Sequence, residues 1–548
     1  MRRLSFALLV ALASLTAVTE AQGSPGITTI VSVDSAGIQG NRDSDVADIG
    51  ANGRYVAFDS SASNLVTGDT NVHRDVFVHD LETATTTRVS VASSGTQANG
   101  LSGSPAVTAD GRFVAFVSWA SNLVPDDTNG HSDIFVHDRQ NGLTTKVSVD
   151  SWGNQANNWS AFSDISADGR FVAFISTASN LVPGDVGTDP DVFVHDRLTG
   201  ATTRVTLGID GAEPNQGSRN PVISSDGRFV AFVSPASNLV SEDTNGAADV
   251  FVYDRETRIM SRVSVNSAGV QGNGISDQAT ISGDGRFVAF ISFADNLVAE
   301  DNNRFCHTEL GEVYNCPDVF VHDRHKALTT RLSANSDGGQ ADTGGGSPAI
   351  SSDGRFVAFS SSPENLSVPE IFLHDRVTGA TERVIVNGSG TEANGATLGP
   401  VLSADGRFLA FVSWASNLVP DDTNGVRDVF VHDLGSSSDS DGDGVPDGVD
   451  SCPLTSSMGF DADADGCIDT LDGLIAMVES LTPEPKIEAG LLTKLNGAQT
   501  ALDRNNMRVA VNNLRSFINQ AKAQRGKSLT SPQADLLAAY ANNLILLM

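Results

Sequence analysis

Two acidic runs between residues 439 and 472 have the residue types and the spacing of calcium-binding loops. In each twelve-residue run, carboxylates stand at positions one, three, five, nine and twelve, and a glycine stands at position six. Calcium binds about six to eight oxygen atoms, and the glycine permits the sharp turn that brings them together. Carboxylates this close together repel one another without a cation. The spacing therefore predicts calcium as a cofactor.

The acidic segment resembles thrombospondin type 3 repeats, with Cys452 and Pro453 between its two loops, and the second loop also resembles a dockerin or half EF-hand. Both runs depart from the EF-hand pattern, because position twelve is Asp where EF-hands have Glu. A flexible acidic linker is the alternative. The resemblance implies two sets of calcium ligands: Asp439, Asp441, Asp443, the Val445 carbonyl, Asp447 and Asp450, and then Asp461, Asp463, Asp465, the Cys467 carbonyl, Asp469 and Asp472.

A shorter oxygen-rich pattern occurs three times earlier in the chain. Each copy reads Asp-Thr-Asn-Gly and has a further Asp at position seven. Oxygen side chains at positions one, three and seven around a glycine suit calcium, whereas Asx turns that cap the loop and the next strand explain the same residues. The candidate ligands are Asp127, Asn129 and Asp133, then Asp243, Asn245 and Asp249, and finally Asp422, Asn424 and Asp428.

Histidines and tryptophans are the other residues that suggest chemistry. One position of a repeated segment holds His79, His137, His195, His322, His374 and His432. A ring of repeats would separate them, so we interpret them as packing residues, and we predict no catalytic residue. The chain has no nucleophile elbow, zincin helix or phosphate loop. Aromatic surface suited to a glycan or a peptide is predicted from Trp119, Trp152, Trp159 and Trp414.

A long repeat must position these residues. Near copies of Asp-Gly-Arg-Phe-Val-Ala-Phe place glycines at positions 53, 111, 169, 227, 285, 354 and 406, and the first five glycines are 58 residues apart. Each copy has the pattern of four short strands, predicted in the second repeat at 104–108, 112–118, 133–138 and 144–149. Four-stranded antiparallel units at this period are typical of β-propeller blades.

The two ends of the repeat region predict how the ring closes. The seventh repeat stops after its third strand at Asp433, and the segment 28–33 matches the fourth strands of other repeats. The predicted fold class is therefore mainly β, with a seven-bladed propeller over residues 28–434. The N-terminal strand closes the last blade and so removes exposed sheet edges.

The repeated segments resemble the WD-type repeats of TolB-like propellers, which occur in exported bacterial proteins and in some peptidases. The resemblance concerns the fold, because this fold carries unrelated activities. Within each repeat, the first-to-second and third-to-fourth strand connections are short, whereas the other two connections are long. We call the side with the long connections the long-loop face, and we expect an unknown protein or glycan partner to bind there.

The last part of the chain has a helical pattern. Apolar stripes that include Leu495, Leu514 and Leu537 predict three helices over residues 486–548, after a connector at 435–473 that holds the calcium loops. This part resembles the FIMAH-type helical module at the C-termini of exported bacterial multidomain proteins. An attachment module and an autonomous packed bundle both explain these residues.

The N-terminus and the composition indicate export. Arg2 and Arg3, an apolar run over 4–18 and a small-residue exit at Ala21 predict a signal peptide over 1–21, and no later stretch is long enough to span a membrane. The net charge of −32 argues against nucleic acid and anionic membranes as partners. The simplest disulfide pairs are Cys306–Cys316 and Cys452–Cys467, with unpaired thiols as the alternative.

These features together predict an exported, calcium-binding, monomeric propeller that binds a protein or a glycan at the cell surface or outside the cell. One alternative is a propeller enzyme, a hydrolase or lyase that acts on glycan or peptide at the long-loop face. The other is a periplasmic partner protein, as TolB itself is.

Overall fold

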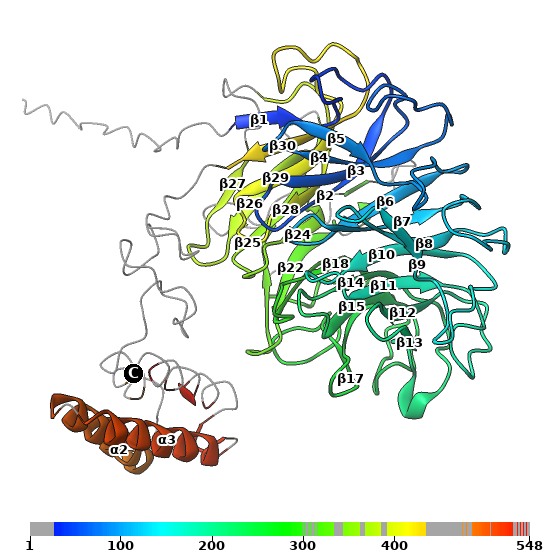
Figure 1. Ribbon diagram of the computed structural model, residues 1–548. Helices are drawn as coiled ribbons and strands as arrows, with labels where there is room; N and C mark the ends of the chain where they lie inside the picture. The colour runs from blue at the N-terminus through cyan, green and yellow to red at the C-terminus, as the bar shows by residue number, and fades with distance from the viewer. Residues whose placement is uncertain are drawn as a thin grey trace, which may run out of the picture.

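Seven four-stranded antiparallel sheets form a closed ring (Figure 1). The first strands of consecutive sheets lie against one another around the ring, and the first strand of the seventh sheet contacts that of the first. The fold is therefore a seven-bladed β-propeller, as the repeat predicts, with helices near the C-terminus. The computed structural model describes residues 27–299, 301, 306–307, 313–314, 316–333, 344–361, 368–384, 392–434, 474, 478, 485–504, 506–525, 527–529, 534, 537–538, 541 and 544.

Blades 1 to 4 follow one another in the chain, each with its four strands in sequence order. Blade 1 contains β2 (Ser44–Ile49), β3 (Tyr55–Ser60), β4 (Asp75–Asp80) and β5 (Thr85–Arg88). Blade 2 contains β6 (Ser102–Val107), β7 (Phe113–Ser118), β8 (Asp133–Asp138) and β9 (Leu143–Lys146). Blade 3 contains β10 (Ser160–Ile165), β11 (Phe171–Ser176), β12 (Asp191–Asp196) and β13 (Ala201–Arg204), followed by the short helix η1 (Ile209–Gly211). Blade 4 contains β14 (Arg219–Ile223), β15 (Phe229–Ser234), β16 (Asp249–Asp254) and β17 (Ile259–Arg262).

Blade 5 has a small hairpin, β20 (Cys306–His307) with β21 (Val313–Tyr314), between its second and third strands. Its four blade strands are β18 (Ser276–Ile281), β19 (Phe287–Ser292), β22 (Asp318–Asp323) and β23 (Leu328–Arg331). Blade 6 contains β24 (Gly346–Ile350), β25 (Phe356–Ser361), β26 (Glu370–Asp375) and β27 (Thr381–Arg383). Blade 7 contains β28 (Thr397–Leu402), β29 (Phe408–Ser413) and β30 (Asp428–Asp433), and its fourth strand is β1 (Ile27–Ile30).

The N-terminal strand closes the ring in the way that the sequence predicts. β1 pairs antiparallel with β30, and the register places Ile27 opposite Asp433 and Ile30 opposite Phe430. The strand is shorter than the predicted segment 28–33, although the backbone N–H of Val31 still donates to the carbonyl of Val429 and the carbonyl of Val33 accepts from the hydroxyl of Thr86 in blade 1. The two ends of the propeller are thus held in one sheet.

The hydrophobic core lies between blades. Successive side chains of a strand point to opposite faces, and in β4 this sends Phe77 toward blade 7 and Val76 and Val78 toward blade 2. Within each blade, a phenylalanine of the second strand stacks on one of the third, as Phe116 does on Phe135 with ring centroids 6.0 Å apart. The repeated Phe and Val positions therefore join each blade to both of its neighbours.

The tight turn between the first and second strands also joins neighbouring blades. In blade 3, Gly169 has a φ of +73°, and a Cβ at that position would lie 2.4 Å from Cδ2 of Phe113 in blade 2. The guanidinium carbons of Arg112 and Arg197 lie 4.6 and 4.3 Å from the centroid of that Phe113 ring. Glycine stands in this turn because the left-handed backbone and the contact with Phe113 both exclude a side chain.

The described C-terminal residues form helices with a core of their own. α2 (Pro485–Asp503) and α3 (Met507–Ala523) pack together, and Asn506 caps α3 by accepting a hydrogen bond from the backbone N–H of Val509. Leu495, Leu514 and Leu537 belong to one buried cluster. None of the described helices is long and apolar enough to cross a membrane.

Candidate functional site

The long-loop face carries a repeated cluster in which a basic side chain lies between acidic ones. In blade 2, Nζ of Lys146 lies 2.9 Å from Oδ1 of Asp127 and 2.8 Å from Oδ2 of Asp133. The same ammonium lies 3.2 Å from Oε1 of Gln155, and the charged side chains are at most 7% exposed. Burial raises the pKa of Asp127, and Lys146 opposes that shift. The cluster thus contains its own cation.

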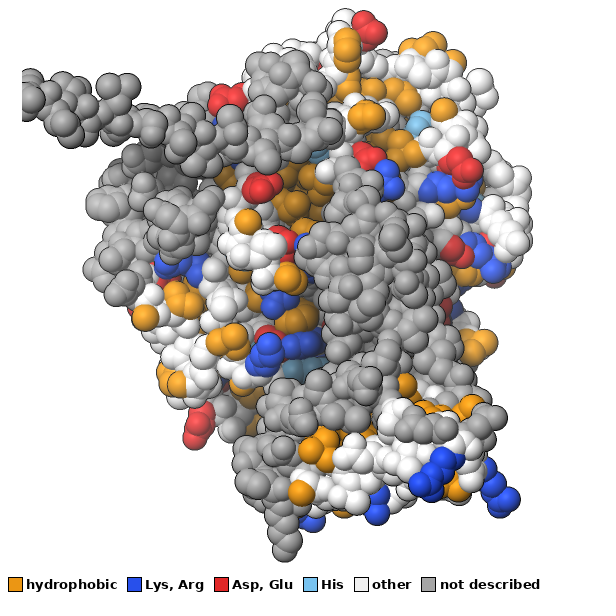
Figure 2. All heavy atoms as spheres, turned by 90° about the vertical axis from the view of Figure 1, so that its left-hand side faces the viewer, with side chains coloured by type: hydrophobic (Ala, Val, Ile, Leu, Met, Phe, Trp, Pro, Cys, Tyr) orange, Lys and Arg blue, Asp and Glu red, His pale blue; other side chains and the backbone are white. Residues whose placement is uncertain are grey.

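Five other blades repeat this arrangement. The basic residue stands at the same position of the fourth strand, opposite a phenylalanine of the third. The pairs are Arg88 with Asp69 and Asp75, Arg204 with Asp185 and Asp191, Arg262 with Asp243 and Asp249, Arg331 with Asp301, and Arg383 with Glu370. Figure 2 shows the side at which β1 begins in Figure 1, the side of the short turns, and there too acidic and basic side chains lie next to one another.

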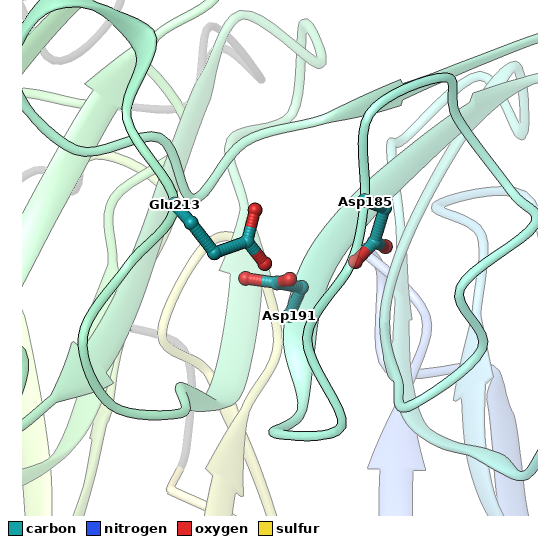
Figure 3. A group of neighbouring side chains, drawn as sticks. All are labelled: Asp185, Asp191 and Glu213. Carbon is teal, nitrogen blue, oxygen red and sulfur yellow. The ribbon is translucent and has the colours of Figure 1, made fainter.

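Blade 3 has the densest of these clusters among the described residues. The carboxylates of Asp185, Asp191 and Glu213 point toward one another, and one oxygen of each lies within 4.8 Å of the others (Figure 3). Nη1 of Arg204 lies 3.4, 3.2 and 2.8 Å from these three groups, respectively. These three carboxylates could hold a metal ion by their geometry, but the ion would have to displace the guanidinium of Arg204.

The structure brings together the loop residues that the sequence suggests as calcium ligands. In blade 2, Nδ2 of Asn129 donates to Oδ2 of Asp133, and Oδ1 accepts from the backbone N–H of His131. Asn245 makes the equivalent bonds to Asp249 and Ala247 in blade 4. These bonds match the Asx-turn interpretation. Calcium in these two loops, whose carboxylates pair with Lys146 and Arg262 of the fourth strands, stays a prediction.

The third loop of this kind differs from the other two. Asp428 in blade 7 accepts hydrogen bonds from Oγ of Ser32 at 2.6 Å and from Nδ2 of Asn424 at 2.7 Å. Ile30 of β1 stands at the strand position that is basic in the other blades. Asp422 and Asp428 are therefore close together without the built-in cation of the other clusters.

One pair of cavity-lining carboxylates, Asp48 and Asp164, is not predicted by the sequence patterns. Asp48 in β2 and Asp164 in β10 line a cavity of about 430 Å³ formed by first strands of neighbouring blades. Oδ2 of Asp48 accepts from the backbone N–H of Val107 at 2.6 Å, and Oδ2 of Asp164 accepts from that of Ile223 at 2.7 Å. Burial raises the pKa of Asp48 to about 7 and that of Asp164 to about 6.

Asp48 and Asp164 occupy the same position of the first strand in their two blades, which the strand pairing identifies. The equivalent position of the first strand holds Ala106 in blade 2, Val222 in blade 4 and Thr280 in blade 5. A carboxylate at this position in two repeats is a local exception, and the structure places both carboxylates on the lining of the cavity.

A third feature is an aromatic cavity of about 370 Å³ at the long-loop end of blades 2 and 3. Trp119, Trp159 and Phe162 line it together with Ser132. Trp119 is 57% exposed and Phe162 is 53% exposed. Phe162 has a φ of +49° at a β-bulge, where the register shifts between Ala161 and Asp164. Bulges of this kind redirect a side chain, here toward the cavity.

Blade 7 has a tryptophan at the same repeat position, Trp414, which is 47% exposed and has an arginine stacked on its ring. The guanidinium carbon of Arg427 lies 4.7 Å from the centroid of the Trp414 ring. The residue equivalent to Arg427 in blade 2 is Ser132, which precedes the third strand in the same way. Because serine is small, Trp119 keeps an open ring face, whereas Trp414 is stacked.

The repeated histidines are packing residues, in line with the prediction. Nδ1 of His137 lies 2.9 Å from Oγ1 of Thr144 in the adjacent strand, and that hydroxyl donates to the carbonyl of Val91 in blade 1. His195 makes the same contact with Thr202, and burial lowers the pKa of His195 to about 4. The histidines therefore connect strands and blades.

Several predicted features lie outside the described residues. They are the signal peptide over 1–21, the acidic connector, and every predicted connector ligand from Asp439 to Asp472, with Cys452 and Cys467. Cys316 is buried and disulfide-bonded. Its predicted pairing with Cys306 stays a prediction.

No protein-family model matches the chain, and no curated protein matches it. Solved structures similar in fold include the propeller domain of the Trilobed protease from Pyrococcus furiosus, 11% identical with a TM-score of 0.45 over 72% of this chain and 96% of that one. An oligogalacturonate lyase in complex with manganese is 13% identical, with a TM-score of 0.44 over 76% and 99% of the two chains. TolB from Acinetobacter baumannii is 14% identical, with a TM-score of 0.33 over 73% and 81%. These likenesses concern the fold alone.

Proposed function

We propose that this chain is an exported binding protein whose propeller holds a glycan in the aromatic cavity of blades 2 and 3, and whose segment 435–473 binds calcium. The observation that carries the proposal is the open ring face of Trp119 beside Trp159 and Phe162. Sugar rings present C–H faces that stack on indole and phenyl rings, and a cavity with aromatic walls and a few polar groups is a typical small-ligand site.

The polar groups of the cavity fit this ligand class. Ser104 and Ser132 line it beside the aromatic rings, and the hydroxyl of Ser132 donates to the carbonyl of Ser160 at 3.0 Å. No charged side chain lines this cavity among the described residues. The site therefore favours a neutral, ring-shaped, hydroxyl-rich group over an acidic or basic peptide.

Binding of soluble polysaccharides and oligosaccharides to the mature chain tests this proposal. A glycan array followed by calorimetry on each positive sugar would identify the ligand. We expect Trp119→Ala to reduce affinity at least tenfold, because it removes the open ring face. Trp152→Ala is the matched control, since Trp152 is 78% exposed and does not line the cavity. Equal affinity of the Trp119 variant and the unmodified chain would overturn the proposal.

One observation favours the enzyme alternative as a second candidate function. Asp48 and Asp164 come from different blades and line one cavity, and the pKa of each carboxyl is raised toward neutral pH. Perturbed carboxylates in a cavity are candidates for general acid–base catalysis. Release of new reducing ends from the same polysaccharides, lost in both Asp48→Asn and Asp164→Asn, would support a hydrolase or lyase over a binding protein.

A further inference from the structure

Blade 7 lacks the basic side chain that lies between acidic residues in the other six blades. Its fourth strand is β1, in which Ile30 pairs with Phe430 as Lys146 pairs with Phe135 in blade 2. The surrounding oxygens keep the same spacing in the chain. Asp422, Asp428 and Gln39 are the equivalents of Asp127, Asp133 and Gln155, the three residues that contact Nζ of Lys146.

The carboxylate of Asp422 has an unsatisfied buried oxygen. Its Oδ1 atom is buried and has no hydrogen-bond partner among the described residues. The other carboxylate oxygen in that condition, Oδ1 of Asp59, lies 2.9 Å from Nη1 of Arg74. No ion pair to Asp422 exists within the described part of the chain. Burying an anionic oxygen without a partner is costly, so this atom indicates a missing ligand.

The nearest groups add negative charge rather than compensate it. Asp428 is fully buried, and its charged neighbours include the carboxylates of Asp422 and Asp43. The neighbouring cation is engaged elsewhere, because the guanidinium of Arg427 pairs with Asp45 and lies over Trp414. The amide oxygen of Gln39 accepts from the backbone N–H of Thr423 at 3.2 Å and retains a second lone pair.

A cavity of about 590 Å³ lies beside Gln39. Ile30, Gln39, Asn41, Asp421 and Asn424 line the cavity. Asp422 and Asp428 are not on its lining, but Asn424 is, and Nδ2 of Asn424 donates to Oδ2 of Asp428.

We propose that blade 7 binds one calcium-class metal cation at the place that Nζ of Lys146 occupies in blade 2, with Asp422, Asp428 and Gln39 as its protein ligands. Two carboxylates and an amide oxygen are hard ligands, and their charge matches a divalent ion. Calcium–oxygen distances are about 2.3–2.6 Å, shorter than the 2.8–3.2 Å around Nζ of Lys146, so the ligands would move slightly inward and water would complete the shell.

This ion would hold the two ends of the propeller together. Gln39 and Ser32, which donates to Asp428, follow β1 near the N-terminus, whereas Asp422 and Asp428 belong to the last repeat. In the other blades one continuous stretch of chain supplies both the acids and the base. Only blade 7 joins distant segments, and there the cation would come from solution, so the metal would add to the β1–β30 pairing that closes the ring. This inference does not rest on the proposed glycan site.

The number of calcium ions bound by the full mature chain tests the proposal. Equilibrium dialysis should show one ion fewer for Ile30→Lys, which restores the built-in cation, and one fewer for Asp422→Asn. Lys146→Ile should bind one ion more, because it gives blade 2 the arrangement of blade 7. Ions in the acidic connector contribute equally to all four proteins, so they cancel in these differences. An unchanged count in both the Ile30 and the Asp422 variants would overturn the proposal.

Thermal unfolding of the propeller gives a second measurement that does not depend on stoichiometry. Calcium should raise the melting temperature of the unmodified chain relative to chelator, and Ile30→Lys should melt at the higher temperature in chelator alone. Asp422→Asn keeps the shape of the side chain and controls for misfolding of the lysine variant. Stabilisation by sodium or potassium with none by calcium would overturn the assignment of a divalent ion.

Discussion

Asp48 and Asp164 show how burial changes the charge of single carboxylates in this protein. Both oxygens of each group accept backbone N–H donors, which favours the ionised form. Burial outweighs these bonds, and the Asp164 carboxylate adds repulsion at Asp48. The pKa of Asp48 therefore lies near 7, far above that of an exposed aspartate.

We predict that Asp48→Asn removes part of the pH dependence of stability. A carboxyl whose pKa is raised by folding stabilises the native state below the unfolded pKa, roughly 4, and that contribution is lost as pH rises through about 7. Between about pH 4 and pH 7 the unmodified chain loses this contribution and the variant does not. The unfolding free energy of the variant should therefore rise relative to that of the unmodified chain as pH increases, by about 1.4 kcal/mol per unit of pKa shift. Urea unfolding at several pH values measures this difference.

Asp164→Asn is the control for the pH experiment. The pKa of Asp164 is raised to about 6. The rise in the unfolding free energy of the Asp164 variant, relative to the unmodified chain, should therefore be complete at a lower pH than that of the Asp48 variant. Parallel stability curves for all three proteins across the range would show that neither carboxyl titrates as the structure indicates.

Turns between the first and second strands act as elements that lock one blade to the next. The Asp-Gly-Arg pattern predicts a tight turn, but it does not predict that the glycine contacts an aromatic ring of the preceding blade. Gly169 lies against Phe113, and Gly227 lies in the same way against Phe171. The repeat retains glycine here for packing between blades as well as for its backbone angle.

We predict that Gly169→Ala destabilises the propeller more than Gly142→Ala does. Both glycines have nearly the same backbone angle, with φ of +73° and +72°. A Cβ at Gly169 would lie 2.4 Å from the Phe113 ring, whereas nothing lies within 4 Å of a Cβ at Gly142. Alanine should cost about 1 kcal/mol at either site from backbone strain, and overpacking should add about 1–3 kcal/mol at Gly169. Equal midpoints of chemical unfolding would contradict this mechanism.

At the scale of the whole molecule, the described hydrophobic clusters divide by sequence. One cluster contains residues between Leu474 and Leu544, and the others contain residues between Ile30 and Leu434. No described cluster combines residues from both ranges. Each part therefore has the apolar contacts of an independent folding unit.

We predict that a mature chain ending at residue 434 unfolds at the same temperature as the propeller within the full chain. Its interblade cores and the β1–β30 pairing are complete without the later residues. Differential scanning calorimetry of the two proteins at equal calcium concentration measures this. A midpoint lower by more than about 4 °C would correspond to roughly 1 kcal/mol or more of lost stability and would show that the C-terminal part supports the propeller.

The sequence by itself determined the architecture of the propeller. A repeated pattern of short strands specifies a blade, and the incomplete seventh repeat with its matching N-terminal segment specifies closure, because sheet edges must be paired. Local patterns of this kind depend on residues near one another in the chain, so their spacing is visible without coordinates. The strand bounds moved by only a few residues.

Only the tertiary structure decided which polar and aromatic residues meet. In blade 2, Lys146 pairs with Asp127, which lies 19 residues away in the chain. In blade 7 the equivalent residues, Ile30 and Asp422, come from opposite ends of the propeller sequence. The same holds for Asp48 and Asp164, which share a cavity, and for Trp119 and Trp159, which share another. Charge compensation and cavity shape depend on three-dimensional neighbours, and a repeat pattern does not reveal which member of the repeat lacks its partner.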